Sequence, residues 1–154
     1  MLVYRIERTK YLSDVLSGRG AALSRGNRWN SLNTPMVYTS GSKSLAILEV
    51  LTRVDLFEDL PEDRLLVSIR IPETIEILEI NPGKLPQSWN HFPSGPDTRI
   101  LGDEFIRKME MAVLKVPSSL VEGEFNFLIN PLHQDVKKIE VVTAEPLHTD
   151  RWRR

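Results

Sequence analysis

The chain has 154 residues, is 41% hydrophobic and 27% charged, and carries a formal net charge of −1. This composition is typical of a soluble protein with a hydrophobic core, so we expect residues 1–154 to form a single domain. The balanced charge argues against a general nucleic-acid-binding surface, and the absence of cysteine excludes disulfides, thiolate metal sites and cysteine nucleophiles. No apolar run is long enough to span a membrane and the first residues lack a signal-peptide pattern, so we expect a cytoplasmic protein.

The N-terminal part of the chain predicts short elements around a long loop. Residues 2–7 alternate between apolar and polar side chains and predict a strand, and residues 10–17 predict a short helix. Residues 18–35 are rich in Gly, Asn and Ser and predict a loop. A short strand over residues 36–40 follows.

The middle of the chain predicts a helix followed by two strands. Ser42 has the residue type and position of an N-cap, and the apolar residues that follow predict a helix from Lys43 to Val54. Strands are predicted over residues 64–71 and 75–80. Proline and glycine make residues 81–97 an irregular segment.

The C-terminal part predicts one more helix and three more strands. Apolar residues recur at helical spacing over 98–111, and strands are predicted over 112–116, 125–129 and 138–142. Short strands thus outnumber helices and do not alternate with them regularly. This pattern favours an α+β fold with a mixed or mostly antiparallel sheet and a few helices.

The segment S-R-G-N-R-W-N-S-L-N-T-P-M-V-Y-T-S, residues 24–40, places Arg28 and Trp29 on a loop. The glycine and asparagines around Arg28 tolerate positive φ, so the loop can fold tightly and aim this side chain. A guanidinium presented in this way suits bidentate binding of a phosphate or carboxylate. The alternative is an arginine that covers Trp29 or pairs with a nearby acid.

Two other side chains have both a structural and a functional interpretation. Glu49 is a lone acid in the apolar run I-L-E-V-L. It fits a surface ion pair with Arg53 four residues later, or a carboxylate at the wall of a pocket. Tyr38 fits a half-buried sheet residue with a bonded hydroxyl, or a flat surface on which a ring-bearing ligand stacks.

Polar residues of the C-terminal half leave similar alternatives. Ser118 follows the end of a predicted strand and fits a turn cap, and no Gly-x-Ser-x-Gly motif surrounds it. Asn126 lies in a predicted strand, where asparagine is disfavoured, so it either has a functional role or satisfies nearby backbone groups. The three histidines have no metal-ligand spacing, and we predict no metal site.

Five motifs occur in an order that resembles the RES-domain family, the toxins of RES–Xre toxin–antitoxin pairs. They are G-N-R-W-N, P-M-V-Y-T-S, S-L-A-I-L-E, V-P-S-S and N-F-L-I-N-P-L-H, within a resemblance that extends from Tyr4 to about Asp150. The arginine, glutamate and serine that give the family its name match Arg28, Glu49 and Ser118. Asparagine replaces a common family glycine at positions 27 and 33, and we expect Asn27 and Asn33 to keep the loop geometry because asparagine tolerates positive φ.

This resemblance implies a fold like that of the ADP-ribosyltransferase toxins and NAD as the substrate, with no prosthetic group. Family members cleave the nicotinamide–ribose bond by hydrolysis or phosphorolysis, and some transfer ADP-ribose to a protein. Glu49, Arg28 and Tyr38 would be the catalytic residues, and Arg28, Tyr38, Ser118 and Asn126 would bind substrate.

The implied roles fit the chemistry of these side chains. Glu49 would bond a ribose hydroxyl and stabilise the positive charge of an oxocarbenium-like transition state. Arg28 would hold the pyrophosphate or a ribose, and Tyr38 would stack on the cationic nicotinamide. Ser118 would hydrogen-bond the ligand or orient Glu49, and Asn126 would complete the pocket.

The resemblance also implies a partner. We expect a cognate Xre-type antitoxin that forms a hetero-oligomer and covers the active site, with nucleic acid bound through the antitoxin alone. Inorganic phosphate is a second substrate if the reaction is phosphorolysis. Two alternatives are an ADP-ribosyltransferase acting on a protein and a catalytically inactive module that binds a nucleotide or an antitoxin.

Overall fold

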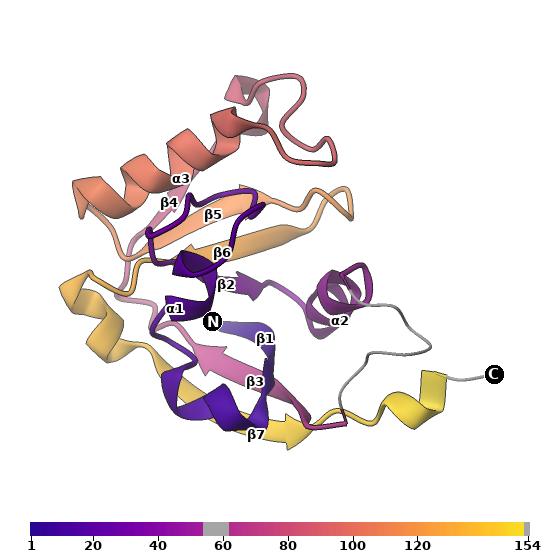
Figure 1. Cartoon of the computed structure of the whole chain (residues 1–154). Helices are drawn as coiled ribbons and strands as arrows, with labels where there is room; N and C mark the ends of the chain where they lie inside the picture. The colour runs from indigo at the N-terminus through magenta and orange to yellow at the C-terminus, as the bar shows by residue number, and fades with distance from the viewer. Residues whose placement is uncertain (54–61, 153–154) are drawn as a thin grey trace.

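The computed structural model describes residues 1–53 and 62–152, and its strands form one mixed sheet (Figure 1). Within these residues the strand order is β4-β5-β6-β2-β1-β3-β7, and only β4 and β5 pair in parallel. The strands are β1 (Leu2–Arg8), β2 (Val37–Ser40), β3 (Arg64–Arg70), β4 (Ile77–Glu79), β5 (Val113–Pro117), β6 (Phe125–Ile129) and β7 (Glu140–Pro146). The predicted α+β fold with a mixed sheet is confirmed.

Helices lie along the sheet and beside its strand ends. The α-helices are α1 (Arg19–Ala22), α2 (Lys43–Leu51) and α3 (Pro96–Lys108), and the 3-10 turns are η1 (Thr9–Asp14), η2 (Pro82–Lys84), η3 (Gln134–Lys138) and η4 (Thr149–Trp152). In Figure 1, α3 runs along the β4–β5–β6 part of the sheet, and α2 lies beside the ends of β1 and β2. Ser42 is the N-cap of α2 as predicted, because its hydroxyl oxygen accepts a hydrogen bond from the Leu45 amide at 3.1 Å.

Several predicted helix boundaries differ from the structure. The helix predicted over residues 10–17 is the 3-10 turn η1, and the loop predicted over 18–35 contains the single-turn helix α1. The helix predicted over 98–111 begins earlier, at Pro96, because the fixed φ of proline suits the first helical position. It ends at Lys108, since Met109 adopts a left-handed φ of 55°.

Two predicted strands and the predicted end of α2 also differ from the structure. The strand predicted over 75–80 shortens to β4, and the strand predicted over 138–142 starts later and continues to Pro146, where it pairs with Leu65 of β3. Helix α2 ends at Leu51, and Val54, the predicted end, lies outside the described residues.

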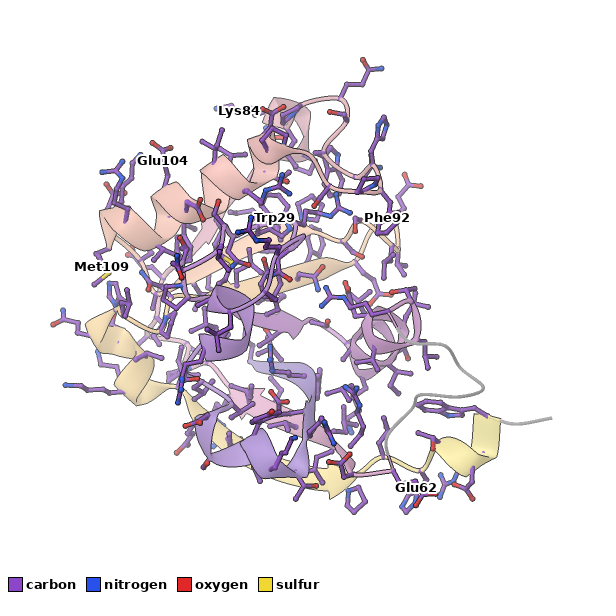
Figure 2. The ribbon with its side chains drawn as sticks, viewed as in Figure 1. Trp29, Glu62, Lys84, Phe92, Glu104 and Met109 are labelled. Atoms are coloured by element: carbon purple, nitrogen blue, oxygen red, sulfur yellow. The ribbon has the colours of Figure 1, made fainter. Side chains whose placement is uncertain are left out.

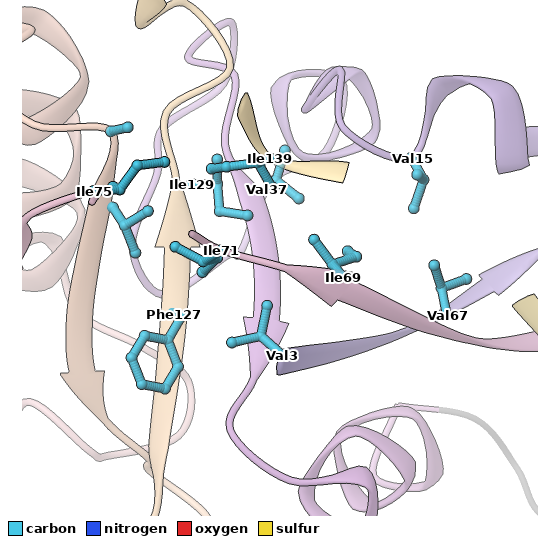
Figure 3. Packing of buried hydrophobic residues seen from close by; sticks show 12 residues of the cluster. Val3, Val15, Val37, Val67, Ile69, Ile71, Ile75, Phe127, Ile129 and Ile139 are labelled. Atoms are coloured by element: carbon cyan, nitrogen blue, oxygen red, sulfur yellow. The ribbon is translucent and has the colours of Figure 1, made fainter. Parts of the chain in front are cut away.

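Two clusters of buried apolar side chains pack against opposite faces of the sheet, because successive side chains of a strand point to opposite faces. The first core cluster includes Val3, Val37, Val67, Ile69, Val113, Phe127 and Ile129 (Figure 3). The second core cluster consists of Trp29, Met36, Phe105, Ile106, Leu114, Val116 and Leu128. Neighbours such as Val37 and Met36, or Ile129 and Leu128, therefore stabilise different faces.

Trp29 joins the loop before β2 to helix α3. Its side chain is 3% exposed and packs in the second core cluster, and Figure 2 shows it beside α3. The helix approaches this loop so closely that a Cβ at Gly102 would stand 1.6 Å from the Trp29 carbonyl oxygen. Glycine at this position thus allows α3 to hold the loop that carries Arg28.

Candidate active site

A cavity of about 830 Å³ lies where β1, β2 and α2 meet three connecting segments. The segments are the loop around Arg28, the loop at residues 90–94 and the turn at residues 119–120. The cavity is large enough for a nucleotide-sized ligand. Arg28, Tyr38, Glu49 and Asn126 all contribute to its lining, so side chains from positions nearly 100 residues apart meet in one place.

The lining is rich in positive charge. Among the described residues it contains five arginines and two glutamates, which are Arg5, Arg25, Arg28, Arg53, Arg64, Glu7 and Glu49. Part of this charge is neutralised locally, since Arg5 pairs with Glu7 at 3.1 Å and Arg53 with Glu49 at 3.8 Å. The remaining arginines give the cavity a surplus of positive charge, which favours an anionic ligand.

Arg28 connects two walls of this cavity. Its Nη1 donates hydrogen bonds to the backbone oxygens of Trp89 at 2.6 Å and His91 at 3.0 Å. Partial burial lowers the pKa of the Arg28 guanidinium from its ordinary value, while the nearby carboxylate of Glu49 acts in the opposite direction. The group remains charged at neutral pH because arginine titrates far above it.

Tyr38 is held in place by its hydroxyl. The hydroxyl donates to Asn30 Oδ1 at 2.6 Å and accepts from the Trp29 amide at 3.1 Å. Burial raises the pKa of Tyr38 above its ordinary value, although the Trp29 amide favours the ionised form. Tyr38 therefore stays neutral at physiological pH and offers the cavity a ring in a fixed orientation.

Asn30 organises the loop around Arg28, although nothing in the sequence distinguishes it from its neighbours. It is 1% exposed, and its Nδ2 donates to the backbone oxygens of Ala21, Ser31 and Thr34. With the bond from Tyr38, this one side chain makes hydrogen-bond contacts with four polar groups, its two N–H groups being shared among three carbonyl oxygens. Its position as one of three asparagines in the loop gave no signal that distinguished it from the other two.

Glu49 enters the cavity from α2. Its side chain is 24% exposed, and the ion pair with Arg53 is long and leaves the arginine mostly in solvent. Such an exposed helical pair contributes only a few tenths of a kcal/mol, so it stabilises the fold little. The carboxylate is thus accessible from the cavity and close enough to Arg28 to influence its pKa.

Asn126 lies in the lining of the cavity, whereas Ser118 does not. Asn126 lines the cavity from β6, and its Nδ2 donates to the Thr39 backbone oxygen and to Ser40 Oγ, both at 3.2 Å. Ser118 is buried outside the lining residues, and its hydroxyl oxygen accepts from the amides of Leu120 and Val121 at 3.0 Å. The next residues of that turn, Ser119 and Leu120, reach the cavity instead.

The expected loop geometry is confirmed in part. Gly26 and Asn33 adopt positive φ, at 83° and 71°. Asn27 does not, which corrects the expectation that both asparagines replace glycine for this reason. Its Nδ2 instead donates to backbone oxygens of Ala21 and Ser24 and closes the turn through its side chain.

Comparison with known protein families identifies the family to which this chain belongs. A model described as the RES domain matches residues 2–150. The chain belongs to the RES domain family. This RES-domain chain is 40% identical over 139 residues to a protein named "Toxin Res" from Photorhabdus laumondii, which covers 90% of this chain and 86% of that protein. The resemblance to the RES family of toxins is confirmed.

Two further similarities extend this comparison. A protein named "Prs ADP-ribosylating toxin" from Sphingobium is 39% identical over 132 residues, covering 84% of this chain and 81% of that protein. The RES-domain fold also resembles a chain in the crystal structure of the M. tuberculosis MbcT-MbcA toxin-antitoxin complex. The TM-score is 0.74 at 18% identity, over 98% of this chain and 86% of that one.

In the described residues of this RES-domain chain, no helix has the length and apolar character needed to cross a membrane.

Proposed function

We propose that this RES-domain toxin consumes NAD by cleaving the bond between nicotinamide and ribose. The observation that carries the proposal is the meeting of Arg28, Tyr38 and Glu49 around one positively charged cavity. A dinucleotide has the anionic pyrophosphate that such a cavity attracts. It also has a cationic ring that suits an aromatic side chain.

Each of the three side chains has a role that its surroundings support. Glu49 bonds a ribose hydroxyl and stabilises the positive charge that develops at the anomeric carbon. Arg28 binds the pyrophosphate through the N–H groups that Nη1 does not use, because Nη1 already holds Trp89 and His91. Tyr38 presents its ring to the nicotinamide and takes no part in proton transfer, since its hydroxyl is bonded to Asn30.

The reaction needs no acid for the leaving group. When the glycosidic bond breaks, its electron pair moves to the ring nitrogen, and the cationic nicotinamide leaves as a neutral molecule. Water attacks the anomeric carbon and loses a proton, which gives ADP-ribose, nicotinamide and H⁺. If phosphate attacks instead, the products are ADP-ribose 1″-phosphate and nicotinamide.

Ser118 and Asn126 support the site in different ways. Ser118 fixes the turn that brings Ser119 and Leu120 to the cavity, and so acts on the ligand through its neighbours. Asn126 holds β2 and β6 together beside Tyr38 and contributes its polar edge to the lining. We place the protein in the cytoplasm, where NAD is abundant, with a cognate Xre-type antitoxin that covers the cavity.

Transfer of ADP-ribose to a protein is the second candidate. It is favoured by the relative from Sphingobium, whose name describes an ADP-ribosylating toxin. Both reactions break the same bond at the same site and differ only in the acceptor. Labelled NAD incubated with cell lysate separates them, because only transfer leaves the label on a protein.

The test is release of nicotinamide from NAD by the purified chain without antitoxin, with and without phosphate. We expect release, at least about a hundredfold slower for Glu49→Gln, because one stabilising charge is lost. The matched control is Glu104→Gln, since Glu104 is a helical glutamate paired with Arg107 at 3.5 Å on α3. A folded parent chain that releases no nicotinamide overturns the proposal, and full activity of Glu49→Gln removes Glu49 from the mechanism.

A further inference from the structure

Phe92 is a large apolar side chain held in solvent at the cavity. It is 94% exposed, and it belongs to the cavity lining together with Asn90 and Ser94 of the same loop. Figure 2 shows it near the end of the loop that precedes α3, on the side of the molecule where α2 lies. What sets Phe92 apart from other exposed apolar residues is its place in the lining of the cavity, since apolar and aromatic side chains commonly line ligand sites.

The loop that carries Phe92 is fastened on both sides of this residue. Before it, Arg28 Nη1 binds the backbone oxygens of Trp89 and His91. After it, Arg99 Nη1 donates to the backbone oxygen and hydroxyl of Ser94, both at 3.1 Å. The loop is therefore positioned by side chains, and its Trp89 packs against the second core cluster, yet the ring of Phe92 has no place in either core cluster.

The hydrogen bond to His91 brings Arg28 close to Phe92. The guanidinium reaches the carbonyl of His91, the residue immediately before Phe92, at 3.0 Å. A ligand phosphate bound by Arg28 therefore lies close to the backbone from which the Phe92 ring projects. A nucleotide joins its base to its phosphate through one ribose, which gives the base enough reach to meet a ring in this position.

We propose that Phe92 is the stacking surface for the adenine of the dinucleotide. This inference rests on the proposed function, which places the reacting ribose at Glu49 and the pyrophosphate at Arg28. The base beyond the pyrophosphate is then the adenine, whose flat face stacks on an aromatic ring without any requirement for specific hydrogen bonds. The nicotinamide half of the substrate lies against Tyr38 and does not contact Phe92.

The test measures binding of the two halves of the substrate separately. ADP contains the adenine and pyrophosphate, and nicotinamide mononucleotide contains the other half. By calorimetry, in a Glu49→Gln background that prevents turnover, we expect Phe92→Ala to weaken ADP binding about tenfold. We expect binding of nicotinamide mononucleotide to stay unchanged, and Phe92→Trp to restore ADP binding.

Controls separate this inference from the fold and from the proposed function. Phe92→Ala removes a side chain that packs little, so the free energy of unfolding should not change. Leu132→Ala, at a residue that is 57% exposed and outside the cavity lining, should alter neither affinity. If Phe92→Ala leaves ADP binding intact, or weakens both ligands equally, the adenine assignment is wrong. If the parent chain releases no nicotinamide, the proposed function is wrong. The adenine assignment is tested by a different measurement, the binding of ADP, so the two failures can be told apart.

Discussion

Two loops supply the cavity with side chains, but different interactions hold them. The loop at residues 25–34 is organised by the buried amide of Asn30, and Asp103 of α3 accepts a further bond from the Ser31 amide at 2.9 Å. The loop at residues 86–95 is held by Trp89, which packs against the second core cluster, and by the charged side chains of Arg28 and Arg99. The first loop is thus anchored in the core by the buried Trp29 and Asn30, whereas the second has one apolar anchor, Trp89, and is otherwise held by arginines that also suit a phosphate.

This difference separates stability from ligand binding. Changes at the buried residues of the first loop should lower the free energy of unfolding, because they leave buried polar groups without partners. Changes at the exposed residues of the second loop should act mainly on the ligand. The variants at Asn30 and Arg28 test this division, and those at Tyr38 and Ser118 test the neighbouring strand and turn; they follow in order of decreasing expected effect.

Asn30→Ala should lower the free energy of unfolding by about 3 kcal/mol, because it leaves several buried groups unsatisfied, including the Tyr38 hydroxyl. Urea denaturation measures the change. The matched control is Asn90→Ala, an exposed asparagine of the second loop that also lines the cavity. Its free energy of unfolding should change by less than about 0.5 kcal/mol. Equal losses in the two variants would contradict the division between the loops.

Arg28→Ala should raise the KM for NAD at least about tenfold, because it removes charged hydrogen bonds to the ligand and frees the second loop. Hydrogen exchange should increase at residues 86–95 and remain slow at residues 29–34. Arg25→Ala, which removes an exposed arginine of the same cavity, serves as the control for charge alone. An unchanged exchange rate in the second loop would show that Arg28 does not hold it.

Tyr38→Phe should cost about 1–2 kcal/mol of stability, because the Trp29 amide and Asn30 lose a partner. It should keep nicotinamide release within about threefold. The raised pKa of Tyr38 means that the folded chain keeps this proton while the unfolded chain loses it above pH about 10. Stability should therefore fall as the pH rises above that value, and less steeply in Tyr38→Phe. Tyr11→Phe, at an exposed tyrosine, is the matched control and should change the free energy of unfolding by less than about 0.5 kcal/mol.

Ser118→Ala should have the smallest effect, a loss of about 1 kcal/mol from a turn whose two amides lose their acceptor. Activity should fall by less than about fivefold, since Ser118 acts through the turn. Thermal unfolding and nicotinamide release measure the two quantities. A large loss of activity with normal stability would instead place the Ser118 hydroxyl on the ligand.

The sequence predicts local features, such as caps and strands, better than it predicts contacts between residues that are far apart in the chain. Ser42 is recognisable as an N-cap because its partner lies three residues away, and the strands follow from alternation. Arg28 is recognisable as an aimed arginine, but its bonds to Trp89 and His91 depend on how a distant loop packs. Asn30 and Phe92 are missed for the same reason, since burial of one and exposure of the other are tertiary properties.

The position of β2 has a consequence for the synthesis of the protein. This strand pairs with β1 from the start of the chain and with β6, so it lies between segments made at very different times. The cavity likewise needs Tyr4 and Asn126 together. A growing chain cannot complete the cavity before β6 has left the ribosome, so a nascent chain lacks the proposed active site for most of its translation. An antitoxin of the kind that we propose as its partner, if translated in the same period, has that interval to accumulate.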